Sequence, residues 1–241
     1  MRRIVAIVLG AVMLAGCVGR DYPPGSPGLG STGTYPAVLL FGDSLLAQAS
    51  PWIAPSLAWH GVDAPVVDRA IGGVGVLDDG FEAYTDDVYS SAPPGSVVVI
   101  QFSGNCFFGP GGGCPHVPGT LLFYDAWRAS LTRAVQRAYE VGLQPLLVVS
   151  PYLGPQAGGD ANTVRWLRAV TEQVAAATST PMVDWGGALH DVNDAYQELL
   201  WYADMFAAPA WHVIRRNDGV HLDGEGGKRA ASWTGHAIAQ L

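Results

Sequence analysis

Short apolar segments alternate with amphipathic segments along the chain, and this alternation predicts an α/β fold. Five segments have the apolar character of strands in a covered sheet, at 37–41, 66–71, 97–102, 145–150 and 181–184. Four others place apolar residues at three- and four-residue spacing or otherwise favour helix, at 45–59, 124–141, 164–177 and 227–241. Strands separated by helices predict a parallel sheet with helices on both faces.

The first seventeen residues have the pattern of an export signal. Two arginines precede a twelve-residue apolar run at 4–15, which is followed by Gly16 and Cys17. As a helix this run would cover roughly 18 Å, too short for a bilayer core of about 30 Å. We therefore expect a signal peptide at 1–16 instead of a membrane span, the alternative being a buried N-terminal helix.

Leu14–Cys17 resembles a bacterial lipobox. The resemblance implies that Cys17 becomes the lipidated first residue of the mature chain, attached to a membrane from outside the cytoplasm. The alternative is an ordinary signal peptide that ends near a cysteine, in which case the protein would be secreted. The expected location is thus the cell envelope.

A spacer follows the proposed anchor. Residues 18–36 contain 13 Gly, Pro, Ser or Thr in 19 positions and show no apolar periodicity. Such a segment stays extended and solvated. The sequence therefore predicts a lipidated cysteine and flexible linker at 17–36, and a single folded domain at 37–241.

The composition argues against a disordered chain and against a nucleic-acid-binding protein. The 241 residues are 49% hydrophobic and 14% charged, with a net charge of −8, and they include no run of Lys or Arg. A chain of this kind can bury a core and is not disordered. A nucleic-acid partner would require a basic surface, so we expect none. We expect a monomer without a cofactor.

Polar groups follow the predicted strands and precede the last helix. Gly42–Ser44 follows the first strand, Gly72 and Gly73 follow the second, and Asn105 follows the third. Asp218 and His221 lie before the final helix. Functional groups gather at the carboxyl ends of parallel strands. A hydroxyl, backbone amides, a carboxamide and an imidazole with a carboxylate are the groups that acyl transfer requires.

These four blocks, in this order, resemble the motifs of the SGNH (GDSL-type) hydrolase family across essentially the whole domain. The resemblance implies a three-layer α/β/α sandwich with a small parallel sheet, of the flavodoxin-like type. It also implies that Ser44 is the nucleophile, His221 the base and Asp218 the carboxylate that orients it. The backbone amides of Ser44 and Gly73 and the side chain of Asn105 would form the oxyanion hole.

Other roles for these residues remain open from the sequence. Ser44 would cap the following helix if it were not a nucleophile. Gly72 competes with Gly73 for the oxyanion position, and Asp184 and Asp223 are alternatives to Asp218. The remaining histidines fit no metal-ligand spacing, so we expect them to be surface or structural residues and expect no metal site; they are His60, His116, His190, His212 and His236.

Cys106 and Cys114 flank a glycine-rich loop directly after Asn105. We expect a disulfide between them, because the bond is permitted outside the cytoplasm, and it would make the loop beside the oxyanion donor rigid. The alternative is two free thiols.

These features predict a membrane-anchored serine hydrolase that cleaves an acyl ester of an envelope glycan or lipid. Two alternatives belong to other classes. One is an O-acyltransferase that uses the same three residues, and the other is a non-catalytic lipoprotein that binds glycan or lipid.

Overall fold

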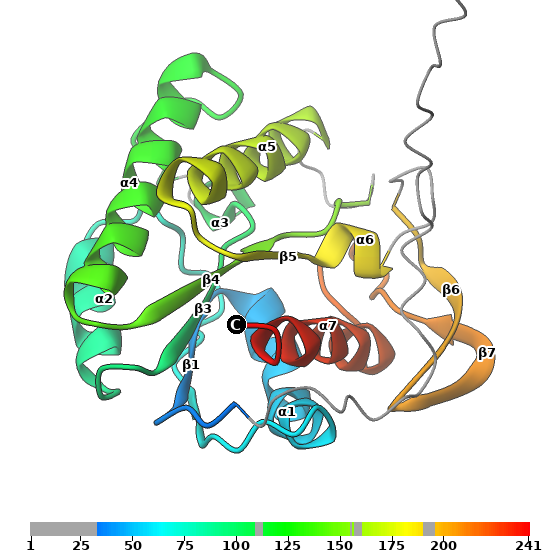
Figure 1. Ribbon diagram of the computed structural model, residues 1–241. Coiled ribbons are helices and arrows are strands. Elements are labelled where there is room, and N and C mark those ends of the chain that lie inside the picture. Colours follow the sequence, from blue (N-terminus) through cyan, green and yellow to red (C-terminus); the bar gives the residue numbers. More distant parts are fainter. Residues whose placement is uncertain (1–32, 109–112, 155, 157–160, 190–195) are drawn as a thin grey trace, which may run out of the picture.

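The protein is built around a five-stranded parallel sheet, as a computed structural model shows (Figure 1). The structure describes residues 33–108, 113–154, 156, 161–189 and 196–241. In spatial order the strands are β2 (Val66–Asp68), β1 (Val38–Gly42), β3 (Val97–Gln101), β4 (Gln144–Val149) and β5 (Met182–Asp184). The predicted α/β class with a small parallel sheet is confirmed.

Helices cover both faces of this sheet and make the three layers that Figure 1 shows. One face carries α1 (Ser44–Trp59), α6 (Trp185–Leu189) and α7 (Gly224–Ile238). The other face carries α2 (Phe81–Ser90), α4 (Leu121–Glu140) and α5 (Ala161–Thr178). The short α3 (Asn105–Phe108) follows β3 at the carboxyl end of the sheet.

Strand β1 shows why the central strands read as continuous apolar runs. Val38 and Leu40 belong to the core beneath α1 and α7, whereas Leu39 and Phe41 belong to the core beneath α2, α4 and α5. All four are fully buried. Because successive side chains of a strand point to opposite faces, a strand covered on both sides has no polar face.

Helices α1 and α7 pack closely, and glycines on α7 permit the contact. A Cβ atom added at Gly227 would lie 2.7 Å from the carbonyl oxygen of Gln48. A Cβ atom added at Gly235 would lie 2.1 Å from the Oγ of Ser56. This packing fixes the helix that begins at Ser44 against the helix that follows His221.

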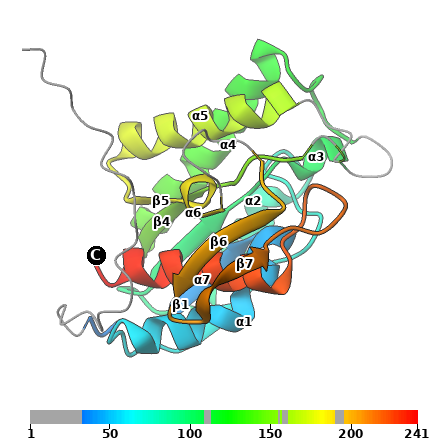
Figure 2. The same ribbon diagram turned by 90° about the vertical axis from the view of Figure 1, so that its right-hand side faces the viewer.

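The structure adds elements that the sequence pattern did not predict. Helix α2 is one, and the antiparallel hairpin of β6 (Leu199–Asp204) and β7 (Ala207–Val213) is another. Strand β2 ends at Asp68, earlier than the predicted 66–71, and α4 begins at Leu121 with Thr120 as its N-cap. The hairpin lies beside the main sheet, and the chain leaving β7 loops back before α7 (Figure 2).

Residues 1–32 lie outside the described part of the chain, so the structure does not test the expected signal peptide, Cys17 or most of the linker. No helix within the described ranges is both long and apolar enough to span a bilayer.

Candidate active site

Ser44 lies where β1 passes into α1, as the first residue of that helix. The N-cap is Asp43, whose Oδ1 accepts the N–H of Leu45 at 2.9 Å. Ser44 therefore does not cap the helix. Its hydroxyl lies at the positive end of the helix dipole.

The structure brings Ser44, His221 and Asp218 into one hydrogen-bonded chain. His221 Nε2 lies 3.1 Å from Ser44 Oγ, and His221 Nδ1 lies 2.8 Å from Asp218 Oδ2. The other carboxylate oxygen, Oδ1, accepts the backbone N–H groups of Val220 and His221 at 2.8 and 2.9 Å. One oxygen of Asp218 thus holds the turn while the other faces the imidazole.

Asp218 is held in its charged form. Partial burial by itself raises the pKa of this carboxyl, but the hydrogen bonds from the backbone and ring of His221 and from Val220 N–H outweigh that effect. The pKa of Asp218 is therefore lower than its usual value. An ionised Asp218 keeps the Nδ1 proton of His221 directed toward it, so Nε2 can accept the proton of Ser44.

The two alternative carboxylates have other partners. Asp184 Oδ1 lies 3.0 Å from a guanidinium nitrogen of the buried Arg168. Asp223 is the N-cap of α7. Of these three carboxylates, the structure places Asp218 against His221.

The expected oxyanion donors lie on the loop after β2 and at the start of α3, and the structure places Gly72 of that loop next to Ser44. A Cβ atom added at Gly72 would lie 3.7 Å from the Cβ of Ser44, and Gly73 has a positive φ of 89°. The side chain of Asn105 donates one N–H to the carbonyl of Val74 at 3.1 Å, and its amide has a second N–H to donate. The choice between Gly72 and Gly73 stays open.

A disulfide joins Cys106 and Cys114, as predicted, with their Cα atoms 5.0 Å apart. Cys106 directly follows Asn105 and is buried. Its backbone nitrogen lies so near the glycine loop that a Cβ atom added at Gly75 would be 3.1 Å from it. The crosslink therefore holds the segment that carries the Asn105 amide.

A buried polar network surrounds Asp43, the residue directly before Ser44. Asp43 is fully buried, and its Oδ2 accepts both the N–H and the O–H of Ser103 at 2.6 Å. Burial raises the pKa of the Asp43 carboxyl, and its hydrogen bonds lower the pKa in part. Gln101 Oε1 accepts the N–H of Leu46 at 3.0 Å. Sequence reasoning missed Gln101 and Ser103, although an amide that ends an apolar strand was a visible signal.

Three of the remaining histidines lie close to other titratable side chains. The rings of His60 and His236 lie 5.3 Å apart, and burial lowers the pKa of both. His212 Nδ1 lies 3.6 Å from a carboxylate oxygen of Glu225. His190 lies outside the described residues. Across the described ranges, no group of three or more His, Cys, Asp or Glu is placed to hold a metal ion.

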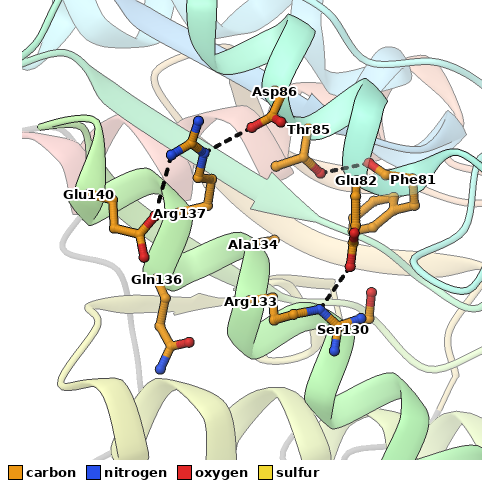
Figure 3. Close-up of a pocket in the computed structure, with 10 residues that line it drawn as sticks. All are labelled: Phe81, Glu82, Thr85, Asp86, Ser130, Arg133, Ala134, Gln136, Arg137 and Glu140. Atoms are coloured by element: carbon orange, nitrogen blue, oxygen red, sulfur yellow. Dashed lines mark hydrogen bonds and ion pairs between the residues drawn. The ribbon is translucent and has the colours of Figure 1, made fainter.

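A cavity of about 260 Å³ lies between α2 and α4 (Figure 3). Its walls carry an ion pair of Arg133 with Glu82 at 3.0 Å and another of Arg137 with Asp86 at 2.8 Å. Ser44, Asp218 and His221 are not among its lining residues. The cavity is therefore separate from the hydrogen-bonded chain described above.

Comparison of the fold finds several ester hydrolases among solved structures. A lipase/acylhydrolase from Enterococcus faecalis is 18% identical, covers 85% of this chain and 95% of its own, and has a TM-score of 0.59. An acetylxylan esterase from Geobacillus stearothermophilus is also 18% identical, covers 86% of this chain and 95% of its own, and has a TM-score of 0.61. An esterase from Pseudoalteromonas, inhibited by monoethylphosphonate, is 12% identical, covers 85% and 97%, and has a TM-score of 0.57.

Comparison of the sequence gives the family. No curated protein matched the chain in sequence. The pattern of the GDSL-like Lipase/Acylhydrolase family matches residues 40–229, which include Ser44, Asn105, Asp218 and His221. The chain therefore belongs to the GDSL-like lipase/acylhydrolase (SGNH) family of ester hydrolases.

Proposed function

We propose that this protein hydrolyses acyl esters with Ser44 as nucleophile, His221 as general base and Asp218 as the group that orients His221. The observation that carries the proposal is the continuous contact from Ser44 Oγ to His221 Nε2 at 3.1 Å and from His221 Nδ1 to Asp218 at 2.8 Å. Serine is a weak nucleophile unless a base lies within hydrogen-bond reach, and this distance satisfies that need.

The reaction proceeds in two halves. Ser44 Oγ attacks the ester carbonyl while His221 Nε2 takes the hydroxyl proton. That proton then passes to the departing alcohol, which leaves an acyl group on Ser44. A water molecule attacks the acyl carbonyl as His221 takes its proton. Ser44 Oγ leaves the carbonyl, receives the proton back, and a carboxylic acid departs.

The oxyanion that forms in each half needs hydrogen-bond donors. The N–H groups of Ser44 and Gly73, with Gly72 as the alternative to Gly73, and the side chain of Asn105 would supply them. Loss of one such donor typically costs about 100- to 1,000-fold in rate.

We infer that the substrate is an acyl ester on an envelope glycan or lipid, with an acetylated polysaccharide as the first candidate. One support is the Geobacillus stearothermophilus relative in fold, an acetylxylan esterase. Another is the export pattern of residues 1–17, because a lipid on Cys17 and a linker to residue 36 would hold the enzyme at a membrane outside the cytoplasm.

The direct test measures turnover of a panel of acyl esters from acetyl to long-chain, together with an acetylated polysaccharide. The wild type should cleave short acyl esters fastest, and Ser44→Ala should abolish turnover without changing the unfolding temperature. Ser50→Ala is the matched control, because Ser50 lies on the same helix and donates to the carbonyl of Ala47. Turnover by Ser44→Ala above a few per cent of wild type would contradict the assigned nucleophile.

A further inference from the structure

The base and the carboxylate of the site lie on one turn, and both side chains are partly exposed. The turn, 214–223, connects β7 to α7 and is closed by the N–H of Asp223 donating to the carbonyl of Ile214 at 3.1 Å. The side chains of Asp218 and His221 are 46% and 34% exposed. Their own burial therefore gives limited support to the 3.1 Å contact with the nucleophile.

Arg215 provides an internal anchor for this turn. Its side chain is among the largest that are fully buried in the described part of the protein. Nη1 donates to the carbonyl of Val220 at 3.0 Å, and Nη2 donates to the carbonyl of Tyr152, beyond β4, at 2.7 Å. A second link joins the same two segments, because the N–H of Gly154 donates to the carbonyl of Gly219 at 2.7 Å.

The guanidinium and the Asp218 carboxylate hold opposite ends of one peptide group. The peptide between Val220 and His221 offers its carbonyl to Arg215 and its N–H to Asp218. Because a peptide group is planar and rigid, fixing both ends fixes the position of the His221 Cα. Burial lowers the pKa of Arg215 to about 10, so the group remains charged at neutral pH and its hydrogen bonds are charge-assisted.

We propose that Arg215 is a positioning residue for catalysis, which clamps the Val220–His221 peptide to the segment after β4 and so keeps the imidazole against Ser44. This inference rests on the proposed function of Ser44 and His221. Lysine is not an equivalent, because its single ammonium group lacks the planar fork that reaches two carbonyls in different segments.

The test compares Arg215→Lys with the wild type on a soluble acyl ester. We expect kcat to fall about 10- to 100-fold, the range that loss of a charge-assisted hydrogen bond predicts, while KM stays within about twofold. Arg168→Lys is the matched control, since Arg168 is also buried and contacts the same segment after β4, at the carbonyl of Ser150 and the ring of Tyr152, but pairs with Asp184 instead of the turn that carries His221. The control should lower the unfolding temperature without a comparable loss of kcat.

Arg215→Gln is the second variant, and it is needed if the buried ammonium group of the introduced lysine unfolds the protein. It removes the buried charge and keeps a planar N–H donor. Circular dichroism gives the folded fraction, so that kcat is expressed per folded molecule. The Gln variant should lose at least as much kcat as the Lys variant.

A double-mutant comparison separates positioning from general destabilisation. In the Asp218→Asn background, where the turn no longer presents a working histidine, Arg215→Lys should cost less than about threefold in kcat. An equal loss in both backgrounds, an equal loss in Arg168→Lys, or a rise in KM at unchanged kcat would overturn the inference.

Failure of the inference differs from failure of the proposed function. If a fluorophosphonate labels Ser44 in the wild type but kcat of Arg215→Lys and Arg215→Gln stays normal, only the role of Arg215 is wrong. If the active wild type is not labelled at Ser44, both proposals are wrong.

Discussion

Asp218→Asn removes the charge of the orienting carboxylate and keeps its shape. The backbone N–H groups of Val220 and His221 both donate to Oδ1, so the asparagine should keep its carbonyl oxygen there and turn its NH₂ toward His221 Nδ1. The ring proton then moves to Nε2 and faces Ser44. In that tautomer His221 cannot take the serine proton.

The expected fall in kcat of Asp218→Asn has two contributions. To restore the active tautomer, the asparagine must turn its carbonyl oxygen toward His221 Nδ1. This turn breaks the two hydrogen bonds from the backbone, worth about 0.5–1.5 kcal/mol each. The lost charge adds about 2 kcal/mol, between the values for water and for a protein surface, because the Asp218 side chain is 46% exposed. The total of about 4 kcal/mol corresponds to about a 1,000-fold fall in kcat, compared with about 10,000-fold for the analogous change in a serine protease triad.

The assay is kcat against pH for the wild type, Asp218→Asn and two controls. Because the pKa of Asp218 is lowered, its carboxylate stays ionised across the neutral range and should not shape the wild-type profile there. The fall in kcat of Asp218→Asn should therefore persist across the neutral range. The same carboxylate stabilises the fold above its unfolded pKa of about 3.9, and this stabilisation is lost as pH falls through its lower folded pKa.

The controls are Asp223→Asn and Asp184→Asn. Asparagine caps helices as well as aspartate, so Asp223→Asn should keep both rate and stability. Asp184→Asn should lower stability through the loss of its ion pair with Arg168. If Asp218→Asn retained a tenth or more of the wild-type rate while either control was crippled, the orienting residue would be misassigned.

Three further changes test the support of the site and the anchor. Asp43→Asn should lower the unfolding free energy by about 1–3 kcal/mol in denaturant titrations, because an NH₂ group must then face a backbone donor. The deficit should shrink as pH rises above about 4, since the raised pKa of Asp43 makes its ionisation costly only in the wild type. Replacing both Cys106 and Cys114 by Ser should reduce kcat about 10- to 100-fold without unfolding the protein, through displacement of the oxyanion donor, and reduction of the wild type should reproduce the effect. Cys17→Ser should move the protein from the membrane to the soluble fraction with kcat unchanged, and retention after a carbonate wash would contradict lipid anchoring.

The central sheet was predictable because burial on both faces leaves a simple pattern. Strands β1, β3 and β4 are almost entirely buried apolar runs, and each was predicted to within one residue at either end. Helix α2 gives a weaker signal, since its ten residues include Glu82, Asp86 and Asp87. The hairpin of β6 and β7 was not predicted for the opposite reason, since it has apolar residues at positions that are exposed to solvent. These exposed residues are Leu199, Trp201, Trp211 and Val213.

The predictable part of the site consists of the residues that belong to local motifs near the ends of strands. Ser44 and Asn105 lie shortly after the ends of β1 and β3, and Asp218 lies three residues before His221, so local sequence places these groups. The supporting side chains depend on contacts between distant segments. Ser103 meets Asp43 across 60 residues, and Arg215 meets Tyr152 across 63. Local periodicity contains no information about such pairs.

Covalent labelling tests the central claim most directly. A fluorophosphonate reacts with an activated serine, and mass spectrometry of the digested protein identifies the modified residue. We predict a single label on Ser44 in the wild type, none in Ser44→Ala, and strongly slowed labelling in His221→Ala, with Ser50→Ala labelled at the wild-type rate. Absence of the label from Ser44 in an active preparation, or labelling that does not depend on His221, would contradict the mechanism.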